Sequence, residues 1–158
     1  TFIDLFSGSG AMGIEALSRG AQGCVFVEQD KAAIQSIKTN LQEVDKRAKS
    51  QNIDFFPLKL LQLDVKNCWQ KLKRVTGRPA DIIWADPPYA GAQEWALIFK
   101  KNLEHISQDG TVFIWELSSK DQLKCEDLGE SWKLIWKRQY GDTSILIWEY
   151  QTKEHLNG

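Results

Sequence analysis

Short apolar runs alternate along this chain with stretches whose apolar residues recur at helical spacing. The run at residues 2–6 precedes a helical stretch at 11–19 that Gly20 closes, and the run at 24–27 precedes a longer stretch that Asp30 can cap. Alternation of this kind predicts βαβ units, in which helices connect neighbouring parallel strands. It restricts the possible folds more than any other feature of the sequence.

The alternation continues as far as residue 117. A third strand is expected after Pro57, because proline cannot sit inside a central strand, and further strands are expected at 81–85 and 111–117. Apolar stripes at 65–75 and 95–106 predict the helices that connect them. The first three quarters of the chain therefore predict a parallel sheet.

The pattern changes near the end of the chain. Residues 132–140 and 144–150 are rich in strand-forming residues, and Gly141-Asp142 between them predicts a tight turn. We expect one α/β domain over residues 1–158, with a doubly wound Rossmann-like fold and a seven-stranded, mostly parallel sheet that ends in an antiparallel C-terminal hairpin. Four tryptophans in strand runs are expected to pack in the core or on the sheet: Trp84, Trp115, Trp136 and Trp148.

Composition narrows the class of protein. With 42% hydrophobic and 26% charged residues the chain is typical of a globular protein, and it contains no apolar run long enough to cross a membrane. The net charge of -1 neither requires nor excludes a nucleic-acid partner, although basic residues cluster at 46–49, 71–78 and 133–138. The three cysteines are too far apart to indicate a disulfide framework or a zinc site. We expect a cytoplasmic protein that holds no metal and contacts no membrane.

Residues able to carry chemistry follow the predicted strands. The first strand leads into Ser7-Gly8-Ser9-Gly10, and Glu28, Asp64 and Asp86 follow the second, third and fourth. In an open α/β sheet, ligands bind beyond the carboxyl ends of the strands. The sequence therefore places a glycine loop and three acids at one rim.

The glycine loop alone does not identify a ligand. Residues 8–13 form a complete G-x-G-x-x-G, which is compatible with a dinucleotide but also with a tight turn that binds nothing. Asp4, inside the first strand, counts against a pyrophosphate because its charge would repel one. Asp4 could pair with a cationic ligand, or it could simply accept hydrogen bonds from loop amides.

The acids after the second and third strands have two interpretations each. Glu28 fits an acceptor for the hydroxyls of a ribose, and otherwise it is an exposed acid in a loop. Asp64 fits an acceptor for an adenine amino group, and otherwise it caps the helix that begins at Val65.

The tetrapeptide Asp86-Pro87-Pro88-Tyr89 closes an apolar run. The two prolines fix φ and remove two amide donors, so the carbonyls of this loop are expected to face outward as acceptors. A carboxylate, a carbonyl and an aromatic face suit a planar group that bears an amino nitrogen. The simpler alternative is a rigid proline turn with a surface tyrosine.

Together these features resemble an S-adenosylmethionine-dependent methyltransferase that acts on an amino group. Residues 4–21, 27–30, 86–89 and 138–143 are similar to the bacterial RsmD-type 16S rRNA guanine-N2 methyltransferases. The resemblance implies that Asp86, Pro87, Pro88 and Tyr89 are catalytic. It implies cofactor contacts at ten positions: Asp4, Phe6, Ser7, Gly8, Ser9, Gly10, Glu28, Gln29, Asp64 and Val65.

The same resemblance implies the partners. It indicates S-adenosylmethionine as cofactor, S-adenosylhomocysteine as product, and 16S rRNA within a small-subunit ribosomal particle as substrate of a monomeric enzyme. Family members carry a further N-terminal segment, so this chain resembles their catalytic core. The residues leave open methylation of adenine in DNA or of a protein glutamine, an NAD-dependent oxidoreductase, and a binding module without catalysis.

Overall fold

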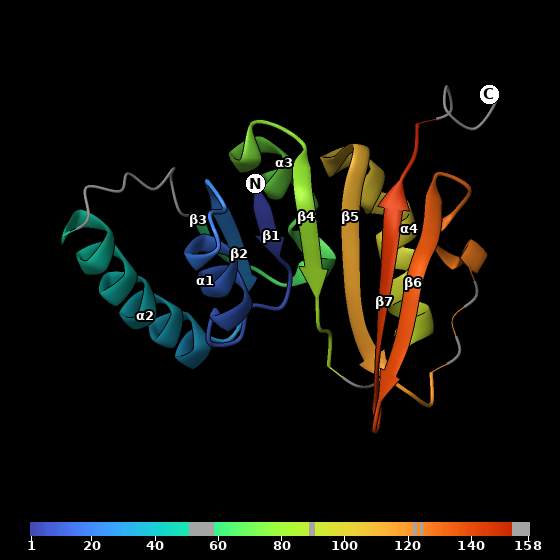
Figure 1. Ribbon diagram of the computed structural model, residues 1–158, viewed down its shortest axis with the longest axis horizontal. Coiled ribbons are helices and arrows are strands. Elements are labelled where there is room, and N and C mark those ends of the chain that lie inside the picture. The colour runs from blue at the N-terminus through green and yellow to red at the C-terminus, as the bar shows by residue number, and fades with distance from the viewer. Residues whose placement is uncertain (51–58, 89–90, 122, 124, 153–158) are drawn as a thin grey trace. The chain divides into compact units, whose positions relative to one another are not determined.

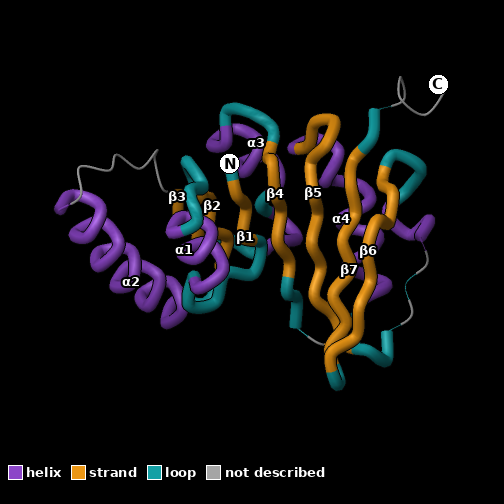
Figure 2. Tube along the Cα trace, in the orientation of Figure 1, coloured by secondary structure: helices purple, strands orange, loops and turns teal. Residues whose placement is uncertain are grey.

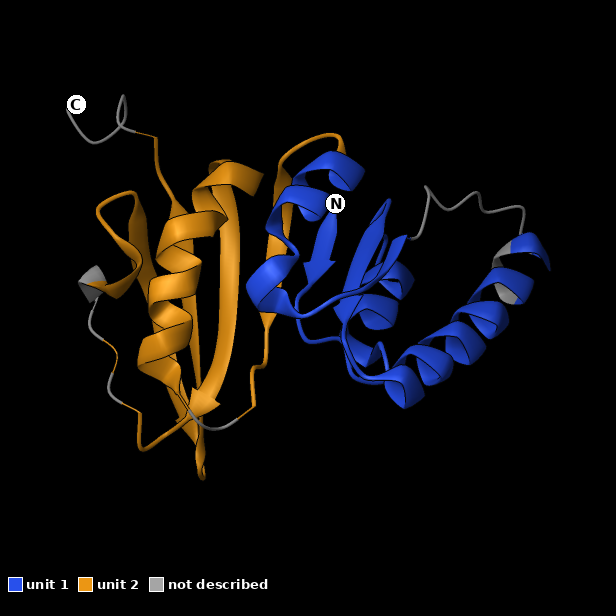
Figure 3. Ribbon diagram, turned by 180° about the vertical axis from the view of Figure 1, so that it is seen from behind, with its two compact units in different colours: residues 1–76 blue, residues 77–158 orange. Residues whose placement is uncertain are grey.

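The computed structural model describes residues 1–50, 59–88, 91–121, 123 and 125–152. The chain divides into two compact units, residues 1–76 and residues 77–158 (Figure 3). Each unit contains its own strands and helices.

Unit 1 contains three parallel strands in the order β3-β2-β1. They are β1 (Phe2–Asp4), β2 (Cys24–Glu28) and β3 (Lys59–Gln62). The first strand was expected to reach residue 6, and this is wrong, because the chain bends toward the glycine loop directly after β1. The third strand does follow Pro57, although residues 51–58 themselves lie outside the described part of the chain.

The helices of unit 1 are α1 (Ala11–Ser18), α2 (Lys31–Ser50), the 3-10 helix η1 (Val65–Asn67) and α3 (Trp69–Thr76) (Figure 1). Asp30 caps α2 as expected, since its Oδ1 accepts a hydrogen bond from the Ala33 N–H at 2.8 Å. The continuous helix expected over 65–75 is wrong. The segment is divided at Cys68, which follows a single 3-10 turn that Asp64 caps.

Unit 2 contains four strands in the order β4-β5-β7-β6 (Figure 2). They are β4 (Ala80–Ala85), β5 (Ser107–Ser118), β6 (Trp132–Tyr140) and β7 (Thr143–Tyr150). β4 and β5 are parallel, whereas β7 runs antiparallel to both β5 and β6, so the expected C-terminal hairpin is confirmed. β5 begins four residues before its expected start.

An aromatic cluster fills the core of unit 2. The helix α4 (Ala92–Asn102) presents Phe99, whose ring centroid lies 4.9 Å from that of Trp115 and 5.2 Å from that of Phe113. Trp148 of β7 stacks on Phe113 at 5.9 Å and is fully buried. The short 3-10 helices η2 (Leu103–Ile106) and η3 (Cys125–Leu128) complete the unit. Of the four strand tryptophans, three are buried, and Trp136 lies on the sheet in the edge strand β6, where it is 38% exposed.

The fold class predicted from the sequence is confirmed: the chain is an α/β protein with seven mostly parallel strands and an antiparallel C-terminal pair. None of the helices in the described part of the chain is long and apolar enough to cross a membrane. Among the same residues no group of three histidine, cysteine or acidic side chains is placed to hold a metal ion.

Candidate active site

The glycine loop of unit 1 is held by its own backbone. Gly8 and Gly10 have φ of 50° and 81°, a left-handed conformation that side chains disfavour, and Gly10 caps the start of α1. The Ser7 hydroxyl donates to the carbonyls of Asp4 and Val27 at 2.9 and 3.2 Å. These bonds connect the loop to the ends of β1 and β2, so its amides have fixed directions.

The third glycine of the motif has a packing role. A Cβ added to Gly13 would lie 2.3 Å from a ring carbon of Phe26 and 2.7 Å from the Sγ of Cys24. The helix α1 therefore contacts β2 so closely that only glycine fits, which is the role of the last glycine in such motifs. Close packing of α1 on β2 therefore explains the glycine at position 13 without any ligand.

Asp4 lies beneath the loop, where its side chain is 1% exposed. Its Oδ2 accepts a hydrogen bond from the Gly13 N–H at 3.3 Å. A buried carboxylate needs such donors, and the amino end of a helix favours negative charge. Burial, and then the charge of Asp4, raise the pKa of the neighbouring Cys24 thiol, so that thiol stays protonated. Asp4 thus accepts this hydrogen bond from the first turn of α1 instead of from the loop at 7–10, and its pairing with a cationic ligand stays a prediction.

Glu28 organises the turn that follows β2. Its Oε2 accepts from the Gly8 N–H at 2.8 Å, and its Oε1 accepts from the N–H groups of Gln29 and Asp30, also at 2.8 Å. A carboxylate has about four lone-pair sites, so three amide bonds leave capacity for a hydroxyl donor. The geometry fits the predicted ribose acceptor, which stays a prediction.

Asp64 lies close to this turn. The Leu63 N–H donates to the Glu28 carbonyl at 3.0 Å, which brings the residues after β3 beside the end of β2. The Asp64 Oδ1 accepts from the Lys66 N–H at 2.9 Å, so its interpretation as a helix cap is confirmed for η1. Acceptance of an adenine amino group stays a prediction. Unit 1 thus brings the glycine loop, Glu28 and Asp64 together, and these acceptors fit an adenosine-bearing cation.

The site residues of unit 2 follow β4. Asp86 comes directly after the last residue of the strand and is exposed, Pro87 is buried, and Pro88 is exposed. Tyr89 lies outside the described residues. Protein atoms around the Asp86 carboxyl desolvate it partly and raise its pKa, although the side chain remains open to solvent.

Glu116 of β5 is a site residue that the sequence did not identify. The parallel register pairs Ala85 with Trp115, so Asp86 and Glu116 are the next neighbours across the two strands. Burial raises the pKa of the half-buried Glu116 carboxyl, and the charge of Asp86 raises it further. The signal available in the sequence was a single acid within the otherwise apolar run at residues 112–117.

Residues 1–149 match the profile of a protein family described as Conserved hypothetical protein 95. The chain belongs to this family. The protein named "Putative rRNA methyltransferase YlbH" from Bacillus subtilis is 32% identical over 149 residues, which are 93% of this chain and 74% of the relative. "Ribosomal RNA small subunit methyltransferase D" from Haemophilus influenzae is 33% identical over 151 residues, which are 93% and 70% of the two chains. The family predicted from the sequence is confirmed.

The matched share of the relatives varies. Other bacterial proteins named ribosomal RNA small subunit methyltransferase D are covered by this chain over 37% to 54% of their length. A solved structure described as "SMU.776, a putative methyltransferase complexed with SAH" has a TM-score of 0.69 and 16% identity. It is matched over 94% of this chain and 44% of its own, and this likeness shows the methyltransferase fold.

Proposed function

We propose that this protein transfers a methyl group from S-adenosylmethionine to the exocyclic N2 of a guanine in 16S rRNA. The observation that carries the proposal is a pair of neighbouring carboxylates, Asp86 directly after β4 and Glu116 on β5, beside a loop whose prolines donate no backbone hydrogen bonds. Relatives named as small-subunit rRNA methyltransferases support the substrate class.

Unit 1 supplies the proposed cofactor site. S-adenosylmethionine, when bound, supplies an electrophilic methyl group on a cationic sulfur. Glu28 accepts the ribose hydroxyls and Asp64 accepts the adenine amino group, while the amides of the loop at 7–10 keep the directions that Glu28 and Ser7 impose. The remaining predicted contacts, at Phe6, Gln29 and Val65, lie on the same turns. Because packing explains Gly13, the glycine motif gives no specific support to an oxidoreductase.

Asp86 and Pro87 prepare the acceptor nitrogen. The lone pair of guanine N2 is delocalised into the ring, which makes it a poor nucleophile. The Asp86 carboxylate and the Pro87 carbonyl accept hydrogen bonds from the two N–H groups, so the nitrogen becomes pyramidal and its lone pair becomes available. The lone pair forms a bond to the methyl carbon as the carbon–sulfur bond breaks, and the Asp86 carboxylate takes up the proton that N2 loses. The two prolines keep these acceptors in place, since transfer depends on alignment of the reacting atoms. Pro88 contributes this rigidity, and Tyr89 is proposed to stack on the base.

Glu116 supplies a third acceptor. Guanine presents three N–H hydrogens on this edge, two on N2 and one on N1, whereas adenine presents a lone pair at N1. A carboxylate beside Asp86 can accept the N1–H of guanine and would repel the adenine lone pair. Glu116 therefore favours guanine over the alternative of adenine in DNA. The base must be unpaired or flipped, because pairing occupies this edge.

The test is methyl transfer from radiolabelled S-adenosylmethionine to small-subunit particles that lack the modification, followed by mapping of the labelled base. We expect one N2-methylguanine in 16S rRNA, S-adenosylhomocysteine as product and a monomeric enzyme. Transfer to DNA or protein, or to no particle, would refute the proposal. Naked 16S rRNA, assayed in parallel, shows whether the cytoplasmic substrate is the assembled particle.

Glu116 is tested on short RNAs that carry the mapped base as guanine or as 2-aminopurine, which keeps the N2 amine and lacks the N1–H. We expect Glu116→Gln to slow transfer to guanine about tenfold or more, and to slow transfer to 2-aminopurine much less. Glu149→Gln, a half-buried acid on β7, is the control and should leave both rates unchanged. Equal losses on both bases would mean that Glu116 does not contact N1.

A further inference from the structure

The edge strand β6 of unit 2 presents basic and aromatic side chains to solvent. Every residue from Ile135 to Tyr140 is exposed, and the nine residues of the strand contain three cations and no acid. Three of the six exposed large hydrophobic side chains in the described chain belong to it: Ile135, Trp136 and Tyr140. In a chain of net charge -1, this strand is a local concentration of positive charge.

The register determines which of these side chains share a face. Residues opposite each other in an antiparallel pair point to the same side of the sheet. Trp136, Arg138 and Tyr140 lie opposite Ile147, Ile145 and Thr143 of β7, which are half-buried, whereas Lys137 lies opposite the buried Leu146 on the other face. We call Trp136, Arg138 and Tyr140 the β6 stripe.

Two contacts show that the stripe is organised. The Arg138 guanidinium lies over the Tyr140 ring, 5.1 Å from its centroid, and so presents a flat cationic surface. The Gln139 side chain donates to the Gly141 carbonyl at 2.9 Å and holds the turn that follows. Lys133, further along the same face, lies opposite Glu149, which balances its charge, so it is not included in the stripe.

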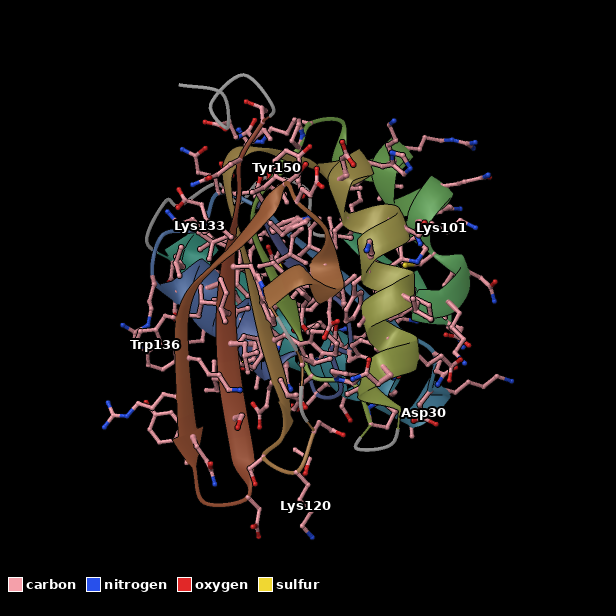
Figure 4. All side chains as sticks on the ribbon, turned by 90° about the vertical axis from the view of Figure 1, so that its right-hand side faces the viewer. Asp30, Lys101, Lys120, Lys133, Trp136 and Tyr150 are labelled. Carbon is pink, nitrogen blue, oxygen red and sulfur yellow. The ribbon has the colours of Figure 1, made fainter. Side chains whose placement is uncertain are left out.

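The stripe lies on the same face of the unit 2 sheet as Asp86. Arg138 is in register with Ile145, Ile145 with Glu116, and Glu116 is the neighbour of Asp86. Four strands at a spacing of about 4.8 Å place Arg138 about 14 Å from Asp86 along this row. Figure 4 shows Trp136 on the β6 side of the unit and Lys101 on α4 at the other side.

We propose that the β6 stripe binds single-stranded RNA next to the target base, with Trp136 and Tyr140 stacking on flanking bases and Arg138 contacting a phosphate. Alternating aromatic rings and cations are how proteins hold single-stranded nucleic acid without reading its sequence. An RNA occupant fits this surface because a phosphate complements the Arg138 cation and a base complements the exposed rings of Trp136 and Tyr140. The inference rests on the proposed rRNA substrate and adds to it a surface outside the cofactor and base sites.

Binding of a fluorescein-labelled single-stranded RNA, followed by fluorescence anisotropy, tests the stripe directly. We expect Trp136→Ala and Tyr140→Ala each to weaken binding between about fivefold and a hundredfold. Tyr140→Phe keeps the ring and should bind like wild type. Leu97→Ala, which removes a side chain that is 70% exposed on α4, is the apolar control and should change nothing.

The cation is tested by the salt dependence of the same binding. Arg138→Ala should reduce the slope of log affinity against log salt by about 0.7, the value for one phosphate contact on a single strand. Arg138→Lys should keep the slope. Lys137→Ala removes a neighbouring exposed cation from the opposite face of β6 and should leave both the slope and the affinity unchanged. Equal effects of Lys137→Ala and Arg138→Ala would overturn the proposal.

Methyl transfer to small-subunit particles separates this inference from the proposed function. The stripe variants should raise KM and leave kcat nearly unchanged, with an unaltered melting temperature and affinity for S-adenosylhomocysteine. If the wild-type protein transfers the methyl group and the stripe variants have the same KM as wild type, the RNA-binding role of the β6 stripe is wrong and the proposed function stands. If the stripe variants bind RNA more weakly than wild type but no particle is methylated, the proposed function is wrong and the RNA-binding role of the β6 stripe is supported.

Discussion

The acids of the two units are used differently. In unit 1 the carboxylates of Asp4, Glu28 and Asp64 accept hydrogen bonds from backbone amides, and through these bonds they shape the turns around the glycine loop. In unit 2 the carboxylates of Asp86 and Glu116 are neighbours, and the pKa of each is raised because burial disfavours its charge. The first arrangement holds the turns of unit 1 in place, whereas the second leaves two acceptors for the proposed substrate.

Removal of the first acid of unit 2 should have the largest effect. We expect Asp86→Ala to reduce methyl transfer about a hundredfold or more, because it removes the proposed acceptor for the amino hydrogens. Its affinity for S-adenosylhomocysteine, measured by calorimetry, should stay that of wild type. Asp81→Asn, an exposed acid at the other end of β4, is the control. Undiminished transfer by Asp86→Ala would show that Asp86 does not accept hydrogen bonds from the substrate, so the contrast between the acids of the two units would be wrong.

A change in unit 1 should affect cofactor binding instead. Glu28→Gln places an amide NH2 where a carboxylate oxygen now accepts backbone N–H groups, so the turn loses at least one hydrogen bond. We expect the affinity for S-adenosylhomocysteine to fall about tenfold. Glu15→Gln removes an exposed acid of α1 that pairs with Arg19, and it should bind normally. If Glu28→Gln binds S-adenosylhomocysteine as tightly as wild type, the turn after β2 does not form part of the cofactor site.

The rigidity of unit 1 can be measured separately through Gly13. The added methyl group of Gly13→Ala would overlap Phe26, and such overpacking costs about 1–3 kcal/mol of stability. For a protein of this size, each kcal/mol lowers Tm by about 2–4 °C. Met12→Ala, an exposed neighbour on α1, should melt close to wild type. A Gly13→Ala variant with an unchanged Tm would show that α1 can move away from β2.

The smallest effect concerns the pH dependence of stability. Burial in the folded protein raises the pKa of Glu116 above its ordinary value of 4.5, so the folded state holds this proton more tightly than the unfolded state does. Stability is therefore lost as pH rises from 4.5 through the raised pKa. Glu116→Gln removes this loss, so its Tm relative to wild type should be slightly higher at pH 8 than at pH 4. A constant difference across that range would contradict the raised pKa of Glu116, which burial and then the charge of Asp86 produce.

The sequence predicted the order of elements because hydrophobic periodicity depends on local spacing. The hairpin around Gly141 was placed to within one residue, since its turn and both strands have local signals. The start of β5 was not predicted: Thr111 donates to the Ala80 carbonyl at 2.6 Å, a contact between residues 31 apart in sequence. The division near Cys68 was missed because an apolar stripe looks alike in a 3-10 turn and an α-helix.

The candidate site divides in the same way. Asp86, Glu28 and Asp64 could be found because they follow predicted strands directly. Glu116 could not, because its position beside Asp86 depends on the register of β4 and β5, which no local pattern determines. Likewise, the exposure of Trp136 depends on β6 being an edge strand. Both the position of Glu116 beside Asp86 and the exposure of Trp136 depend on contacts between residues that are distant in sequence.

The close approach of Gly13 to Phe26 also bears on how such sequences are compared. The last glycine of G-x-G-x-x-G belongs to a nucleotide-binding motif, but in this chain it is required by the short distance between α1 and β2. This packing requirement does not depend on the ligand, so the glycine is needed whichever ligand the loop binds. In a sequence comparison, a glycine at this position therefore indicates close packing of the helix on the strand. The acids around the loop are the residues that indicate which ligand it binds.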